Sequence, residues 1–225
     1  EKVDCSGLFV DRNASTSYSV ILTGFGRDRV ILNYAGATAL LDHSKKINWG
    51  KMNADWFFVS SLHGKGELLS KIFLRAKKTG ALIGFNPGNK EIALGLKWLQ
   101  KLPVKPSVLL LNAREAQKLT GFSDTKKNLN ALYEFAQVVV ITDGEKRVFV
   151  YNGKKVYSKK PFKIKVVDTS GAGDAFNAGF VGALAKEKST KEALDWGIAN
   201  SNSVVQHLGT KNILLSKKQM ELAVK

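Results

Sequence analysis

The sequence has few of the features that mark secreted, membrane or zinc-binding proteins. Cys5 is the only cysteine in 225 residues, which excludes an internal disulfide framework and a cysteine-based zinc cluster. No segment approaches the roughly 18 apolar residues that a membrane span needs. The first residues also lack the charged start and apolar core of a signal peptide. We therefore expect a cytoplasmic protein that does not bind a membrane.

Arginine is also scarce. Only six of the 35 basic residues are arginine, although the net charge is +16. The lysines are scattered singly and in pairs, with no stripe of arginine and aromatic residues of the kind that stacks on bases. We therefore interpret the charge as a solvated lysine-rich surface rather than a nucleic-acid site. Such a surface would also attract a small anionic substrate.

Two patterns follow one another along the chain. Residues 15–36 contain two β-branched runs separated by glycines, which predicts a β-hairpin with a longer loop. From about residue 50, short apolar runs alternate with helical patterns, which predicts a mostly parallel sheet covered on both faces. We expect strands at 55–60, 81–86, 107–112, 137–142 and 163–167, and a second hairpin at 146–158. The fold class is therefore α/β, a three-layer sandwich over residues 1–225 that carries a small hairpin.

A small polar residue follows each predicted strand of the sheet. Such residues are good turn and helix N-cap residues, which explains any one of them. In open α/β sheets, however, ligands bind beyond the carboxyl ends of the strands. Because every strand ends in this way, we expect a ligand crevice along this edge. The residues are Ser60, Asn86, Asn112, Thr142-Asp143 and Asp168-Thr169.

The last of these ends opens a glycine-rich turn, VVDTSGAGDAF, at residues 166–176. The turn lacks the Gly-Lys-Ser/Thr ending of a P-loop, and Phe176 stands where a dinucleotide fingerprint needs its third glycine. The glycines permit a tight turn, and the helix that follows begins with free N–H groups. These groups and the helix dipole would form a cradle for a phosphate.

Asp174, in the first turn of that helix, has two interpretations. An acid there interacts favourably with the helix dipole, by about 0.3–1 kcal/mol. A carboxylate beside a bound phosphate would instead repel it, but could take the proton from a hydroxyl that attacks the phosphorus. The spacing alone does not decide between them.

The stretch DTSGAGDAF resembles the DTxGAGDxF signature of the PfkB/ribokinase family of ATP-dependent sugar and nucleoside kinases. Three further segments resemble that family in the same order, and the resemblance extends from about residue 15 to the end. They are LLLNAREAQKLTG, VVVITDGEKRVFVY and IANSNSVVQHLGT.

The resemblance implies a mechanism. Asp174 would be the general base, and the N–H groups of Gly171, Ala172, Gly173 and Asp174 would stabilise the charge on the transferred phosphoryl group. The hairpin at 15–36 would be a lid that excludes water from the sugar.

The resemblance also implies the cofactors, ATP and Mg²⁺. Glu115 would lie near the magnesium ion, and Asp168 and Ser170 would border a monovalent cation such as K⁺. Asn112 and Glu115 also form a capping-box pattern, and Thr142 and Gly144 also suit a turn. The nucleotide contacts implied by the resemblance are Asn112, Thr142, Gly144 and Asn200.

The sequence departs from the family in three places. We find no Gly-Gly-x-x-x-Asn segment, which in the family binds the acceptor sugar near the start of the chain. We therefore expect a fragment, a chain completed by another, or a degenerate relative, with a raw sheet edge. Arg147 stands where many relatives have a second glycine. FNPGNK, at 85–90, lacks the arginine of some sugar-acid kinases.

We therefore expect ATP-dependent phosphorylation of a sugar hydroxyl. A nucleoside kinase is the nearest alternative, and a non-catalytic remnant that binds nucleotide or nucleic acid is the alternative from another class. The lid strands are where we expect a homodimer to form.

Overall fold

The structure is a computed structural model that describes residues 3–8, 10–25, 28–40 and 47–224. Its centre is a six-stranded sheet in the order β3-β4-β5-β6-β7-β8. The pairs from β3 to β6 are parallel, and β7 and β8 continue the sheet antiparallel. The strands are β3 (Trp56–Val59), β4 (Leu82–Phe85), β5 (Val108–Asn112), β6 (Val138–Asp143), β7 (Arg147–Tyr151) and β8 (Val156–Lys159).

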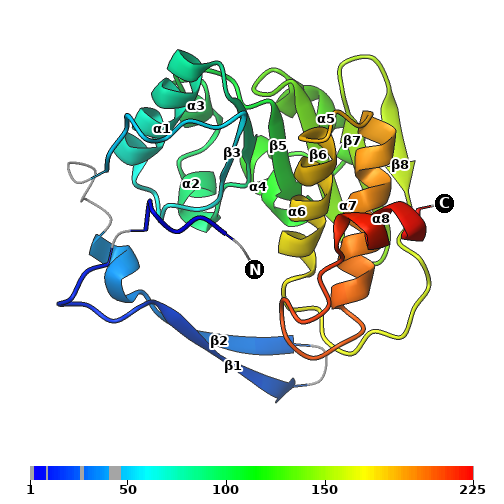
Figure 1. The fold of residues 1–225 in the computed structure, drawn as a ribbon. Helices are drawn as coiled ribbons and strands as arrows, with labels where there is room; N and C mark the ends of the chain where they lie inside the picture. Colours follow the sequence, from blue (N-terminus) through cyan, green and yellow to red (C-terminus); the bar gives the residue numbers. More distant parts are fainter. Residues whose placement is uncertain (1–2, 9, 26–27, 41–46, 225) are drawn as a thin grey trace.

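Helices cover both faces of this sheet (Figure 1). Five come between β3 and β6, and three follow β8. The first group is α1 (Gly66–Thr79), α2 (Asn89–Ala93), α3 (Leu96–Leu99), α4 (Ala113–Thr120) and α5 (Thr125–Tyr133). The second group is α6 (Ala172–Leu184), α7 (Thr190–Val204) and α8 (Lys217–Ala223). The prediction of a three-layer α/β sandwich is confirmed.

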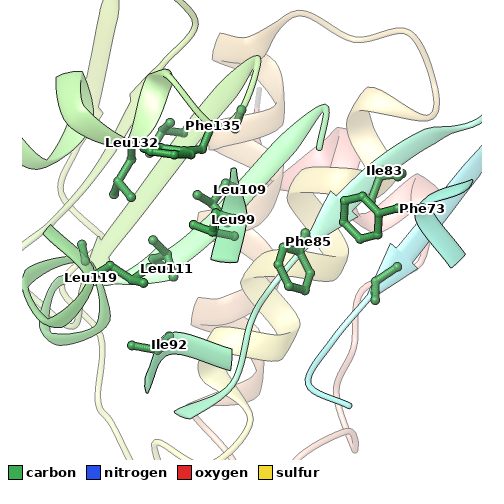
Figure 2. Packing of buried hydrophobic residues seen from close by; sticks show 14 of the residues in the cluster. Phe73, Ile83, Phe85, Ile92, Leu99, Leu109, Leu111, Leu119, Leu132 and Phe135 are labelled. Carbon is green, nitrogen blue, oxygen red and sulfur yellow. The ribbon is translucent and has the colours of Figure 1, made fainter. Parts of the chain in front are cut away.

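The side chains of β5 show why both faces are buried. Leu109 and Leu111 join the core that contains Phe73 and Phe85, which Figure 2 shows from close by. The alternate residues, Val108 and Leu110, join a second core with residues of α6 and α7. Successive side chains of a strand point to opposite faces, so a continuously apolar strand contributes to two cores.

The hairpin predicted at 15–36 is present as β1 (Tyr18–Phe25) and β2 (Asp28–Tyr34). The two strands are antiparallel and form a sheet of their own, apart from the core and facing the end at which α6 begins (Figure 1). A 3-10 helix, Gly36–Leu40, follows β2. Gly26 and Arg27, between the two strands, lie outside the described residues.

Glycine is required at the base of this hairpin. Gly36 has φ +48, and a Cβ atom there would lie 2.3 Å from the carbonyl oxygen of Ser15. That carbonyl accepts a hydrogen bond from the backbone N–H of Ala37 at 2.8 Å. The close approach of the two backbones therefore depends on the absence of a side chain at residue 36.

The predicted strand at 163–167 is wrong. The structure has no strand between β8 and α6, although the second hairpin is formed as β7 and β8. The backbone N–H groups of Val167 and Asp168 donate to the carbonyl oxygen of Val205 rather than to a sheet neighbour. Val166 and Val167 are 52% and 54% exposed, so their β-branched side chains are not in a core.

Two glycines divide or end helices beside the sheet. Gly95 separates α2 from α3 with a positive φ of +73, which glycine adopts without strain. Gly80 ends α1 in the left-handed conformation.

β3 forms one end of the sheet among the described residues, with β4 as its only neighbour. It is four residues long, and Phe58 on it is 48% exposed. The raw edge expected from the sequence is therefore present at this strand. An unpaired strand edge is a surface on which another strand can add.

Candidate functional site

Asn112 and Thr142 lie opposite each other at the carboxyl ends of β5 and β6. They are the last register pair of these two parallel strands. Gly144 follows in the turn to β7 with φ +53, and it is exposed with no atom within 4 Å of where a Cβ would be. The sheet therefore places these three predicted nucleotide contacts side by side at one edge.

Asn112 also forms a capping box with Glu115 at the start of α4. The side-chain oxygen of Asn112 accepts from the backbone N–H of Glu115 at 2.9 Å. The backbone N–H of Asn112 donates in return to the Glu115 carboxylate at 2.8 Å. The capping interpretation is confirmed, and Asn112 is nevertheless exposed.

Partial burial changes the acidity of Glu115. Burial raises its pKa above the usual range, while hydrogen bonds from Asn112 and the charge of Lys118 act in the opposite direction. A nearby cation would stabilise the ionised form of such a carboxyl group. A cation beside Glu115 would therefore lower the pKa of its carboxyl group and stabilise the ionised form.

The carboxylate of Glu115 bears on whether a magnesium ion fits this edge of the sheet. Within the described ranges, no three His, Cys, Asp or Glu side chains are grouped so that they could hold a metal. Magnesium in phosphoryl-transfer sites usually takes only one or two carboxylates, with substrate phosphates and water as its other ligands. A single carboxylate at the end of β5 fits an ion that is held mainly by phosphates and water.

Gly171 is the N-cap of α6, with φ +77 and no side-chain cap. A Cβ atom there would lie 2.9 Å from both the Cβ and the carbonyl oxygen of Thr210. Only glycine fits this position without displacing the segment that carries Thr210. The turn therefore places residues 168–171 against the loop that follows α7.

Asp174 is the third residue of α6, and both it and Gly173 are exposed. By contrast, Asp124 caps α5, because its carboxylate accepts from the backbone N–H of Lys127 at 2.8 Å. Within the part of the chain that the structure describes, the Asp174 carboxylate has no such hydrogen bond. Asp174 is therefore a first-turn acid whose side chain is open to a ligand.

Asp168 and Ser170 shape the turn before α6. Asp168 accepts from the backbone N–H of Ser170 at 2.9 Å and from that of Gly209 at 3.5 Å. Ser170 is buried, with 8% of its surface exposed. The Asp168 carboxylate therefore joins the turn to the loop that carries Thr210.

Helix α6, which begins at the glycine turn, packs on the strands that end in Asn112 and Thr142. Phe176 and Phe180 pack in the same core as Leu110 and Val140, which lie on β5 and β6. Figure 1 shows that α6 begins at the end of the core that faces the two-stranded sheet. The glycine turn thus lies on the helical layer over the strands that end in Asn112 and Thr142.

Asn200, the remaining predicted nucleotide contact, is buried and hydrogen-bonded within the protein. It is 2% exposed on α7. Its amide nitrogen donates to the carbonyl oxygen of Ala175 at 2.7 Å, and its side-chain oxygen accepts from the N–H of Leu215 at 2.9 Å. Each polar group of the amide therefore has one hydrogen bond within the protein.

The sequence analysis did not single out Glu91, a buried acid at the same edge of the sheet. It is 1% exposed, and its carboxylate accepts from the N–H groups of Leu62, Gly64 and Gly88 and from the Ser61 hydroxyl. Glu91 is the third residue of α2, and its bond to the N–H of Gly88 is the glutamate half of a capping box, since glycine has no side chain to supply the other half. Glu91 thereby fixes the loop after β3 to the start of α2.

Comparison with known proteins identifies the family of the chain. The model of the pfkB family carbohydrate kinases matches residues 1–217. A cytidine kinase of Thermococcus kodakarensis is 30% identical over 166 residues, which are 72% of this chain and 59% of that protein. A ribokinase of Haemophilus influenzae is 33% identical over 68% of this chain and 49% of its own length. The chain thus spans only about half to three fifths of these relatives.

Solved structures give the same fold. Ribokinase from Cryptococcus neoformans in complex with ADP has a TM-score of 0.79 at 22% identity, over 95% of this chain and 73% of that one. The nucleoside kinase of Methanocaldococcus jannaschii has a TM-score of 0.78 at 22% identity, over 95% and 69%. Among the described residues, no helix is long and apolar enough to cross a membrane.

Proposed function

Because the chain belongs to the PfkB family of carbohydrate kinases, we propose that it carries the nucleotide and phosphoryl-transfer side of an ATP-dependent kinase for a sugar hydroxyl. The observation that carries this proposal is the open start of α6. There, Gly171 gives the tight turn, and the side chain of Asp174 stands exposed in the first turn of the helix. Of the N–H groups in this turn, that of Ala172 donates to the carbonyl oxygen of Thr169 at 3.3 Å. An anion hole with an adjacent base is the arrangement that phosphoryl transfer to an alcohol needs.

Asp174 would take the proton from the acceptor hydroxyl as its oxygen attacks the γ-phosphorus. The bond from that phosphorus to the leaving oxygen of ADP breaks as the new oxygen–phosphorus bond forms. A base that is exposed in the free protein and covered in the complex suits this step, because the lid would then exclude competing water.

The N–H groups of residues 171–174 would stabilise the charge that develops on the transferred phosphoryl group. The first N–H groups of a helix have no partner within it, and the helix dipole adds a partial positive charge. Preorganised donors of this kind contribute about 3–4 kcal/mol each in acyl transfer, which sets the order of magnitude.

Asn112, Thr142 and Gly144 would bind the nucleotide at the ends of β5 and β6. Their common edge and the exposed positions of Asn112 and Gly144 support this role. Magnesium, when bound near Glu115, would neutralise charge on the β- and γ-phosphates. The raised pKa of Glu115 is consistent with a carboxyl group that a cation would ionise more readily.

A monovalent cation such as K⁺ is proposed beside Asp168 and Ser170. Support comes from the turn that these residues form behind the α6 start. Replacing K⁺ by Na⁺ in the assay should then lower the transfer rate without changing the fold.

The apolar lid is the proposed surface for a second copy of the chain. Val20 and Ile21 are 47% and 40% exposed, and they point to opposite faces of the two-stranded sheet. Their partners across the hairpin, Leu32 and Ile31, are 55% and 51% exposed. One face would cover the acceptor, and the other would contact the lid of a second copy. Leu32→Lys should then convert a dimer to a monomer, as measured by analytical sedimentation.

A nucleoside is the second candidate acceptor, and the 30% identity to a cytidine kinase favours it. Ribose, fructose, adenosine and cytidine should be compared as acceptors of radiolabelled γ-phosphate from ATP. Transfer to one of the sugars supports the proposal, and transfer to a nucleoside alone replaces it by the second candidate. ATP binding without any transfer would instead identify a non-catalytic nucleotide-binding protein.

A further inference from the structure

The amide of Asn200 joins three segments that are distant in sequence. It lies on α7, donates to Ala175 in the first turn of α6, and accepts from Leu215 just before α8. With an exposed fraction of 2%, it has no access to solvent. A buried amide with both groups bonded fixes the relative positions of the segments that it joins, because losing either bond leaves a buried group unsatisfied.

Ala175 directly follows the proposed base, Asp174. Its backbone N–H donates to Gly171 at 2.8 Å, which closes the first turn of α6. Its carbonyl oxygen receives the Asn200 amide at 2.7 Å. The bond from Asn200 therefore acts on the same helical turn that carries the Asp174 side chain and the proposed anion hole.

Helices α6 and α7 also approach each other closely at two glycines. A Cβ on Gly179 would lie 2.8 Å from the carbonyl oxygen of Trp196, and one on Gly197 would lie 2.7 Å from the Phe176 ring. Asn200 and Ala175 continue this contact toward the start of α6. Small residues set how close the helices come, while a directed hydrogen bond also sets their rotation.

The second bond of Asn200 holds the loop behind the glycine turn. Leu215, which it binds, ends the stretch that follows α7. In that stretch, Gly209 donates to Asp168, and Thr210 lies against Gly171. The Asn200 amide therefore holds the glycine turn through two segments: the first turn of α6 and the loop that packs on the turn.

We propose that Asn200 is a positioning residue that fixes the rotation of α6 and so aims Asp174 and the N–H groups of the glycine turn at the phosphate. It acts through Ala175 and the loop before α8, and it does not touch the nucleotide. This role rests on the function proposed above for the start of α6.

The test compares Asn200→Ala and Asn200→Asp with Asn202→Ala. Asn202 is a matched control, because it lies on the same helix, is 8% exposed and has a buried amide nitrogen with no hydrogen-bond partner among the described residues. Asn200→Asp keeps an acceptor for Leu215 but loses the donor to Ala175. Both Asn200 variants should lower kcat roughly tenfold to a hundredfold, the scale of a small misplacement of reacting groups. The Kd for ATP should change less than about threefold, since no nucleotide contact is removed.

Two outcomes would overturn the proposal. A weaker Kd for ATP with unchanged kcat would make Asn200 a nucleotide contact, as the sequence alone suggested. Equal effects of Asn200→Ala and Asn202→Ala on kcat and on the unfolding midpoint would make its role generally structural.

Hydrogen exchange tests the positioning role independently of activity. The amides of residues 175–177 should exchange at least about tenfold faster in Asn200→Ala than in Asn202→Ala, because the first turn of α6 opens more readily. Unchanged exchange would overturn the proposal even in a chain that transfers no phosphate. Absence of ATP binding and transfer in the unaltered chain would count against the proposed function instead.

Discussion

Asn112 and Thr142 face each other as the last register pair of β5 and β6. Each residue comes directly after a run of buried apolar side chains, Leu109–Leu111 in one strand and Val139–Ile141 in the other. The parallel pairing of these runs is what brings two polar groups together from positions 30 residues apart in the sequence. The strand pairing that buries the core of the sheet thus also places these two polar residues at the proposed nucleotide edge.

Two substitutions at Asn112 separate its capping role from its proposed nucleotide role. Serine keeps a side-chain oxygen for the N–H of Glu115, so Asn112→Ser should change the free energy of unfolding by less than about 0.5 kcal/mol. Asn112→Ala loses the cap and should cost about 1 kcal/mol. Both should weaken ATP binding several-fold, since both remove the amide, and calorimetric titration measures this. If ATP affinity fell only in Asn112→Ala, the variant that loses stability, Asn112 would be a helix cap and not a nucleotide contact.

The close contact of α6 and α7 predicts opposite effects of alanine at two glycines of α6. Gly179→Ala places a Cβ 2.8 Å from the Trp196 carbonyl oxygen, and the helices must separate. We expect a loss of about 1–3 kcal/mol, as for other overpacked sites. Gly182 is the matched control, because a Cβ there meets no atom within 4 Å. Gly182→Ala should be neutral or stabilise by up to about 1 kcal/mol, and chemical denaturation measures both. Equal stability of the two variants would contradict the packing described.

Glu91 predicts a pH dependence of stability. Burial alone would raise its pKa, but hydrogen bonds from Gly64, Ser61 and Leu62 outweigh this and hold the pKa below its ordinary value. The stabilisation is therefore fully present above the pKa of the unfolded chain, roughly 4.3. It is lost as the pH falls below that value and through the lower folded pKa.

Glu91→Gln should remove this part of the acid destabilisation and lower stability at pH 7. Glu67→Gln is the control, since Glu67 is 84% exposed in a surface pair with Lys71. Unfolding midpoints between pH 3 and pH 7 measure both variants. The same acid slope in Glu91→Gln as in the unaltered chain would contradict the account.

The sequence predicted most of the fold because the strong local signals agreed with the tertiary arrangement. The run at 108–111 is continuously apolar, and it forms the part of β5 that is buried on both faces. The run at 163–167 is rich in β-branched residues, but its Val167 N–H donates to Val205 and not to a neighbouring strand, and Val166 and Val167 remain exposed. Pairing is a tertiary property that a local pattern does not contain.

The site was predictable where the chemistry lies in a short motif. The glycine turn and Asp174 are adjacent in sequence, and their helix-start geometry follows from local backbone rules. Asn200 was predicted as a nucleotide contact from resemblance alone. Its bonds to Ala175 and Leu215 join segments 25 and 15 residues away, which only the packing of α6 on α7 brings together.

Asp174 is proposed as a base, and not only as a favourable charge at a helix start. Asp174→Asn keeps the size of the side chain and removes the proton acceptor. The control is Asp124→Asn, which changes a capping acid at the start of α5. The measurement is single-turnover transfer of γ-phosphate to the preferred acceptor, together with the Kd for ATP.

The account predicts that Asp174→Asn lowers the transfer rate by about a hundredfold or more, the contribution of a positioned general base. Its Kd for ATP should stay within about threefold of the unaltered chain, and Asp124→Asn should transfer at the normal rate. An Asp174→Asn chain that transfers phosphate as fast as the unaltered chain would contradict the assignment.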